Sequence, residues 1–149
     1  FRVELIDGGG LPSAKNLDIN LVQKPKTAPF FGESNKSLRI RRLRFLDDQP
    51  CVLEEIHLDS MKTNGQRFDQ ISQSVYLFYK DILNLRIMSA KDSATLLPVP
   101  SWAPEEFKLA HDNATVCIER LANDQFGAPV EFSRSWIDTS IARYTTRIS

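Results

Sequence analysis

The stretch from residue 38 to residue 58 constrains the fold most, because it has the form of a long β-hairpin. Two strand-like runs flank the polar turn formers at 47–50. Alternate side chains of a strand point to opposite faces. Arg42 and Arg44 therefore share a face with aliphatic residues, and so does Glu54 on the returning run. Those aliphatic residues are Leu38, Ile40, Leu46, Val52, Ile56 and Leu58.

Charges on an aliphatic strand face need an explanation, since charged side chains are rarely buried unless they are paired. With a three-residue loop at 47–49, Arg42 stands directly opposite Glu54. A loop of two or four residues places the two on opposite faces or out of register. Two interpretations stay open at this point: a cross-strand ion pair that only stabilises the sheet, or a polar site for a ligand.

The composition is that of one globular domain. The chain has 149 residues, of which 42% are hydrophobic, and its 19 basic residues equal its 19 acidic ones. This balance argues against a nucleic-acid surface within the chain, and no apolar run is long enough to span a membrane. Cys51 and Cys117 resemble small core residues of a protein in a reducing, cytoplasmic compartment. We find no motif for a metal or cofactor and expect neither.

Apolar–polar alternation predicts an α+β fold, with a mainly antiparallel sheet of about six strands and helices packed on it. Besides the hairpin, strands are expected within 1–6, 17–23, 85–97, 115–121, 130–137 and 143–148. Apolar residues from Phe68 to Ile82 have helical spacing, with Asn64 or Asp69 as the N-cap. A second short helix is expected from Pro104 to His111, with proline in its first turn.

A set of polar residues is more informative than any catalytic motif. The sequence has no nucleophile–base signature, and His57 is better explained as a strand residue. The set comprises Arg42, Arg44 and Glu54 from the hairpin, Ser74 and Tyr76 on the predicted helix, and Glu131, Ser133 and Ser135 alternating on a strand. Arginine suits a phosphate or carboxylate, and glutamate, serine and tyrosine suit sugar hydroxyls. The alternative for Ser74 and Tyr76 is an ordinary helix surface.

Four short motifs in this order resemble the UTRA domain, the effector-binding part of HutC-like regulators of the GntR type. They are the hairpin segments 42–55 and 123–135, the helix start Ser74-Val75-Tyr76, and the tail 142–148 with Arg143 and Tyr144. The resemblance covers about residues 15–149 and leaves 1–14 as a linker or leading strand. It departs from the family after Ser135, where Trp136 or Ile137 replaces a common pocket tyrosine.

The resemblance implies a chorismate-lyase-like fold with a ligand cavity, a homodimer, and a DNA-binding winged helix-turn-helix upstream of Phe1. The implied effector is a small anionic metabolite, either a sugar phosphate or a carboxylate. The implied effector-binding residues are Arg42, Arg44, Glu54, Ser74, Tyr76 and Glu131, with Ser133, Trp136, Arg143 and Tyr144 as secondary candidates. Two other functions remain: an enzyme of the chorismate-lyase type, and a dimerisation module with a vestigial pocket.

Overall fold

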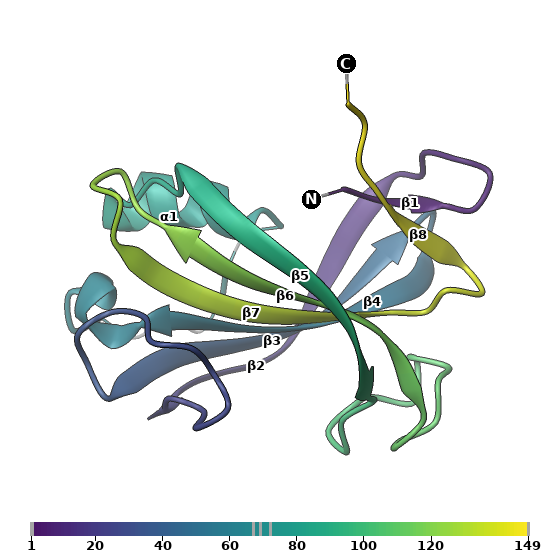
Figure 1. The fold of residues 1–149 in the computed structure, drawn as a ribbon, viewed down its shortest axis with the longest axis horizontal. Helices are drawn as coiled ribbons and strands as arrows, with labels where there is room; N and C mark the ends of the chain where they lie inside the picture. Colours follow the sequence, from purple (N-terminus) through teal and green to yellow (C-terminus); the bar gives the residue numbers. More distant parts are fainter. Residues whose placement is uncertain (1, 67, 69, 72, 149) are drawn as a thin grey trace.

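A strongly twisted, antiparallel sheet of six strands dominates the computed structural model, which describes residues 2–66, 68, 70–71 and 73–148 (Figure 1). Its strand order is β2-β3-β4-β7-β6-β5, and a separate two-stranded sheet pairs β1 with β8. The strands are β1 (Arg2–Leu5), β2 (Pro12–Gln23), β3 (Lys36–Leu46), β4 (Gln49–Asp59), β5 (Ser89–Pro98), β6 (Ala114–Asn123), β7 (Pro129–Ile137) and β8 (Ala142–Thr145). The predicted α+β class and antiparallel sheet are confirmed.

The central hairpin reaches the predicted register by a different route. Leu46 pairs with Gln49, so the loop has only two residues, Asp47 and Asp48. Both have positive φ angles, 48° and 62°, as tight hairpin turns require and as aspartate tolerates. The register then shifts after Arg44, which leaves Cys51 as the extra residue of a β-bulge. This bulge restores the pairing of Arg42 with Glu54 that a three-residue loop would have produced.

Helix α1 (Val75–Leu83), the one α-helix among the residues that the structure describes, is shorter than the apolar spacing predicted. Ser74 is its N-cap and accepts a hydrogen bond from the Leu77 amide at 3.2 Å. Asn64 instead ends the 3-10 helix η1 (Ser60–Thr63) in a left-handed conformation, and Asp69 lies outside the described residues. No helix in the described part of the chain has the length and apolar character needed to cross a membrane.

The expected helix at 104–111 is wrong, because that segment forms separate turns. The Phe107 amide donates to the Pro104 carbonyl. On either side of the segment, the Val99 amide donates to the Asn113 carbonyl, and the Asp112 amide donates to the Val99 carbonyl. Fastening the two ends together closes a loop, which buries Phe107 beneath the sheet. Tertiary packing thus overrides a weak local preference. The expected strand at 85–97 is β5, which begins at Ser89.

Three apolar clusters surround the sheet and locate the site. The first packs α1 against Leu38 and Ile40 of β3, and the second packs the β1–β8 sheet against Leu46 at the other end of the same face. The third lies on the opposite face, beneath the loop at 99–113. Arg42 and Arg44 fall on β3 between the first two clusters, where the sheet is covered by neither α1 nor the small sheet.

Candidate functional site

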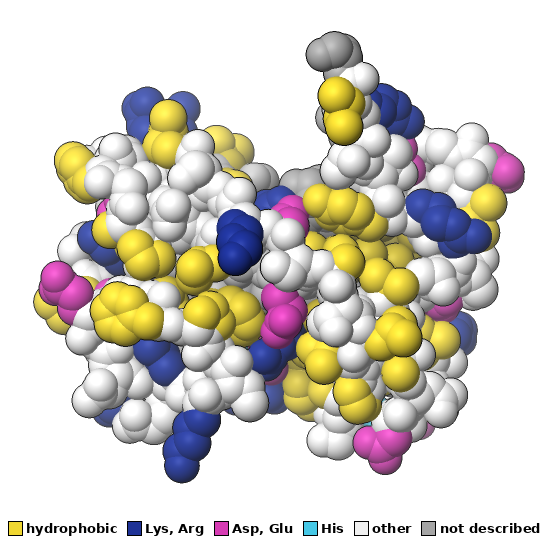
Figure 2. Space-filling view, viewed as in Figure 1, with side chains coloured by type: hydrophobic (Ala, Val, Ile, Leu, Met, Phe, Trp, Pro, Cys, Tyr) yellow, Lys and Arg dark blue, Asp and Glu magenta, His cyan; other side chains and the backbone are white. Residues whose placement is uncertain are grey.

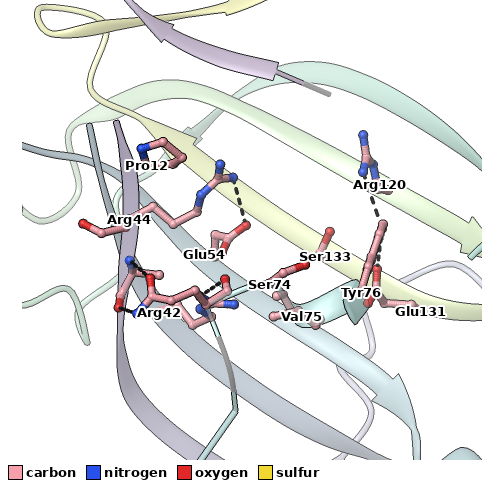
Figure 3. Close-up of a pocket in the computed structure, with 14 residues that line it drawn as sticks. Pro12, Arg42, Arg44, Glu54, Ser74, Val75, Tyr76, Arg120, Glu131 and Ser133 are labelled. Atoms are coloured by element: carbon pink, nitrogen blue, oxygen red, sulfur yellow. Dashed lines mark hydrogen bonds and ion pairs between the residues drawn. The ribbon is translucent and has the colours of Figure 1, made fainter. Parts of the chain in front are cut away.

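A pocket of about 490 Å³ occupies the space between α1 and the β1–β8 sheet (Figure 3). This volume is ordinary for a small-molecule site. Strands β2, β3, β4, β6 and β7 and the N-terminal end of α1 contribute to its wall. The lining residues are Pro12, Ser13, Ala14, Arg42, Arg44, Glu54, Ile56, Gln73, Ser74, Val75, Tyr76, Arg120, Glu131 and Ser133.

One end of the pocket is rich in arginine. Arg44 forms an ion pair with Glu54, with 3.4 Å between Nη1 and Oε2. Arg42 lies directly opposite Glu54 in the sheet register, but its Nη2 donates to the carbonyl of Gln73 at 2.7 Å. The cross-strand ion pair of Glu54 is therefore with its diagonal neighbour, Arg44, and not with Arg42. Because Glu54 accepts from Arg44 within a site that also holds Arg42, this end carries an excess of positive charge.

The buried position of Arg42 removes its charged side chain from water. It is 3% exposed, and its Nε has no hydrogen-bond partner among the described residues. Burial lowers the pKa of the guanidinium, although Glu54 opposes this effect. A buried donor without a partner is destabilising, and an anion in the pocket offers a way to satisfy it. Arg39, on the opposite face of β3, also has a buried Nε without a partner in the described part of the chain, but Arg42 is the one of the two that lines the pocket. Its donor is therefore the one that a ligand in the pocket can satisfy.

The start of α1 closes over the same end. Ser74 and Val75 are pocket-lining residues at the N-terminal end of the helix, where amides and the helix dipole favour negative charge. The side chain of Gln73 fastens this segment to β2: Oε1 accepts from the Ala14 amide at 2.7 Å, and Nε2 donates to the Ala14 carbonyl at 3.1 Å. The helix start is thus positioned against the arginine strand by hydrogen bonds across the pocket mouth.

The other end has a buried carboxyl group at its floor. Glu131 is 1% exposed and accepts from Tyr79 at 2.5 Å and from Tyr76 at 3.1 Å. Burial raises the pKa of Glu131 to about 7, against the hydrogen bonds from both tyrosines and the charge of Arg120. Burial and the neighbouring carboxylate also raise the pKa of both tyrosines. These tyrosines therefore remain hydrogen-bond donors at neutral pH.

Arg120 is a pocket residue that the sequence analysis missed. Its Nε and Nη2 donate to both oxygens of Asp92, at 2.7 and 2.9 Å, and its Nη1 approaches the Tyr76 hydroxyl at 3.4 Å. A recognisable signal was present, because Arg120 alternates with Val116, Ile118 and Ala122 along β6. This is the same pattern of a charge on an aliphatic strand face that singled out Arg42.

The structure brings together seven of the ten candidate residues around one pocket: Arg42, Arg44, Glu54, Ser74, Tyr76, Glu131 and Ser133. Figure 3 shows Arg42, Arg44 and Glu54 at one side, Tyr76, Glu131 and Arg120 at the other, and Ser74 and Ser133 between them. The helix-surface interpretation of Tyr76 is wrong, because its hydroxyl reaches the buried Glu131.

Three secondary candidates lie elsewhere. Trp136 belongs to the cluster on the opposite sheet face, where its indole donates to the Pro98 carbonyl at 3.1 Å and its ring packs edge-on against Trp102. The period of two along β7 explains this, because Glu131 and Ser133 share the pocket face and Trp136 does not. Arg143 donates to the backbone of its own turn, at Thr139 and Ala142. Tyr144 lies on β8 and donates to Asp92.

A buried row of Ser37, His57 and Glu55 resembles a catalytic triad only in its residue types. The Ser37 hydroxyl lies 2.8 Å from His57 Nδ1, and His57 Nε2 lies 2.8 Å from Glu55. Ser37 is fully buried and His57 is 3% exposed, so no substrate reaches the hydroxyl. We interpret the row as a satisfied core network. Within the described residues, no group of three or more His, Cys, Asp or Glu side chains is arranged to hold a metal ion.

The sequence is similar to that of a known domain family and of a transcription regulator. The model of the UTRA domain matches residues 9–143. The HTH-type transcriptional regulator SmoD of Agrobacterium fabrum is 43% identical over 148 residues, which are 99% of this chain and 63% of that protein. The chain therefore spans less than two thirds of that relative's length.

Solved structures share the fold at low identity. The ligand-binding domain of a putative GntR-family regulator from Bordetella bronchiseptica has a TM-score of 0.81 at 13% identity, covering 99% of this chain and 96% of that one. PhnF from Mycobacterium smegmatis has a TM-score of 0.76 at 14% identity, covering 93% of this chain and 63% of that one. At such identities the likeness concerns the fold alone.

Proposed function

Since the chain belongs to the UTRA domain family, we propose that it senses a small anionic metabolite and thereby regulates an upstream DNA-binding domain. The matching relatives are transcription regulators, which favours a regulatory domain over an enzyme. The observation that carries the proposal is the orphaned, buried Arg42 beside Arg44 and the start of α1. These groups match a phosphate or carboxylate.

The remaining polar groups of the pocket favour a polyhydroxylated ligand with a single anionic group. Glu54, Glu131, Tyr76 and Ser133 supply hydrogen-bond acceptors and donors along the pocket, whereas a second anion would meet the carboxyl group of Glu131. A sugar phosphate combines an anion for the arginine end with hydroxyls for the rest. We therefore favour sugar phosphates over dicarboxylates within the anionic class.

A thermal-shift comparison tests the ligand class directly. We expect glucose 6-phosphate or a related sugar phosphate to raise the melting temperature, while glucose, citrate and inorganic phosphate have smaller effects. A ligand at a hundred times its Kd adds about 2.7 kcal/mol to the free energy of unfolding, or roughly 5–10 °C for a chain of this size. If sugar phosphates and carboxylates alike leave the melting temperature unchanged up to millimolar concentration, the proposed ligand class is wrong.

Regulation requires that the pocket influence DNA binding in the full-length protein. We propose that an occupied pocket favours one arrangement of two copies, and so one spacing of their DNA-binding domains. The edge strand β5 suits the contact between copies, because β6 is its one partner strand in the described part of the chain and its Leu96 is 66% exposed. Figure 2 shows several hydrophobic patches on the face that β5 crosses.

We expect sedimentation velocity to show a homodimer at micromolar concentration, and Leu96→Lys to weaken dimerisation at least about tenfold, because a lysine on an edge strand opposes strand pairing. Phe30→Lys is the matched control, since Phe30 is 81% exposed and lies in the loop before β3. A wild-type chain that sediments as a monomer at high micromolar concentration would refute the dimer. Equal dimerisation of both variants would exclude β5 from the interface.

A further inference from the structure

The β1–β8 sheet is connected to the six-stranded sheet by two short chain segments, 6–11 and 138–141, and by the packing of side chains. In the part of the chain that the structure describes, neither strand pairs with a strand of the six-stranded sheet. An apolar cluster that includes Val3 and Ala142 holds the small sheet against Leu46 and Ile137. Figure 1 shows both chain ends beside this small sheet. Its position therefore depends on side-chain contacts and not on strand pairing with the large sheet.

A line of polar contacts also reaches this small sheet, and it begins in the pocket. The Tyr76 hydroxyl donates to Glu131 at 3.1 Å, and Arg120 Nη1 lies 3.4 Å from the same hydroxyl. Arg120 binds Asp92 through two nitrogens, and Asp92 Oδ2 also accepts from the Tyr144 hydroxyl at 3.0 Å. Five side chains from α1, β5, β6, β7 and β8 thus form one hydrogen-bonded series.

We propose that the series Glu131–Tyr76–Arg120–Asp92–Tyr144 couples occupancy of the pocket to the position of the β1–β8 sheet. This inference rests on the proposed effector-sensing function and names its means of regulation. Tyr144 pairs with Val3 of β1 in the strand register. A shift of Tyr144 therefore moves β1, to which an upstream domain would be attached.

The weakest link in the series is the one that a ligand reaches. The 3.4 Å contact between Arg120 and Tyr76 is long for a hydrogen bond, and both residues line the pocket. A ligand hydroxyl that accepts from Arg120 competes with this contact, and one that donates to Glu131 competes with the Tyr76 hydroxyl for the same carboxyl group. Arg120 then turns toward the ligand, and Asp92 loses part of a two-nitrogen, charge-assisted interaction.

Because Asp92 is charged, a change at Arg120 affects the end of the series at Tyr144. Hydrogen bonds from Arg120 hold the pKa of Asp92 below its ordinary value, against the effect of burial. If Arg120 withdraws, Asp92 retains its bond from Tyr144 but loses the cation that neutralised it. The carboxylate is then better hydrated if it turns toward solvent, which it can reach because β5 is an edge strand. Tyr144 must follow or lose its partner, and either outcome loosens β8.

A double-mutant cycle read out by hydrogen–deuterium exchange tests the series in the 149-residue chain without any ligand. The readout is the exchange of the β1 and β8 amides. We expect Tyr144→Phe to accelerate it at least about threefold, and Tyr76→Phe to accelerate it by a smaller factor. Adding Tyr76→Phe to Tyr144→Phe should then have no further effect. Uncoupled sites that do not touch one another would give factors that multiply.

Tyr79→Phe is the matched control, because Tyr79 also donates to Glu131 but is not a member of the proposed series. Its factor should be the same with and without Tyr144→Phe. If the factors for Tyr76→Phe and Tyr144→Phe simply multiply, or if Tyr79→Phe behaves as Tyr76→Phe does, the coupling is absent. Because no ligand is present, this result is independent of the thermal-shift test: either proposal can fail while the other stands.

Discussion

Alanine in place of Arg44 should weaken the binding of an anionic effector about tenfold or more, and alanine in place of Arg42 should weaken it at least as much. A hydrogen bond to a charged group contributes roughly 1.5–3 kcal/mol, and 1.4 kcal/mol corresponds to a factor of ten in affinity. Arg42 carries a buried Nε that has no hydrogen-bond partner among the described residues, so alanine removes a donor that is available to a ligand in the pocket. Isothermal titration calorimetry with the sugar phosphate identified by thermal shift measures both affinities.

Arg39→Ala is the control for this prediction. Arg39 belongs to the same strand but points to the other face, where it pairs with Asp18 at 2.8 Å. It should leave affinity unchanged, whereas a non-specific effect of removing an arginine from β3 would lower affinity in all three variants. Unchanged affinity in both Arg42→Ala and Arg44→Ala would mean that the anion does not bind at this end of the pocket.

Charges on aliphatic strand faces predicted which residues line the pocket, because period-two alternation is a strong geometric constraint. It placed Arg42, Arg44 and Glu54 on one face before any contact was known. The same rule applied to β6 would have added Arg120, and applied to β7 it would have removed Trp136, which falls on the alternate face. The resemblance to a family motif drew attention to Trp136 instead, and local periodicity was the better guide there.

The sequence could not predict features that depend on exact loop geometry. The two-residue turn and the extra residue at Cys51 together shift the register by as much as a three-residue loop would. The pairing of Arg42 with Glu54 is therefore the same in both cases. Similarly, Ser74 rather than Asn64 or Asp69 begins the helix, because a cap depends on where the chain turns and not on residue type alone. The Arg120–Asp92–Tyr144 series joins three strands that are distant in sequence, so no local pattern marks it.

Glu131→Gln should change how stability depends on pH. Burial raises the folded-state pKa of Glu131 from its ordinary value of 4.5 to about 7, so between these pH values the folded state binds more protons than the unfolded one. The free energy of unfolding of the wild type therefore falls as pH rises through this window, and it levels off above about pH 7. The full loss is about 3 kcal/mol. Glutamine cannot ionise and so avoids it.

Between pH 5 and pH 8, the free energy of unfolding of Glu131→Gln should rise relative to that of the wild type by up to about 3 kcal/mol, as measured by urea denaturation. Tyr76 and Tyr79 donate to different oxygens of Glu131, so the amide oxygen of glutamine accepts from one of them and its NH2 group faces the other. The lost hydrogen bond lowers the stability of the variant by a similar amount at every pH, and the test therefore compares the slopes of the two curves. Glu105→Gln, at an exposed position, should follow the wild-type curve and so serves as the control. Parallel curves for Glu131→Gln and the wild type would show that Glu131 is ionised throughout this range, and that the tyrosines and Arg120 outweigh its burial.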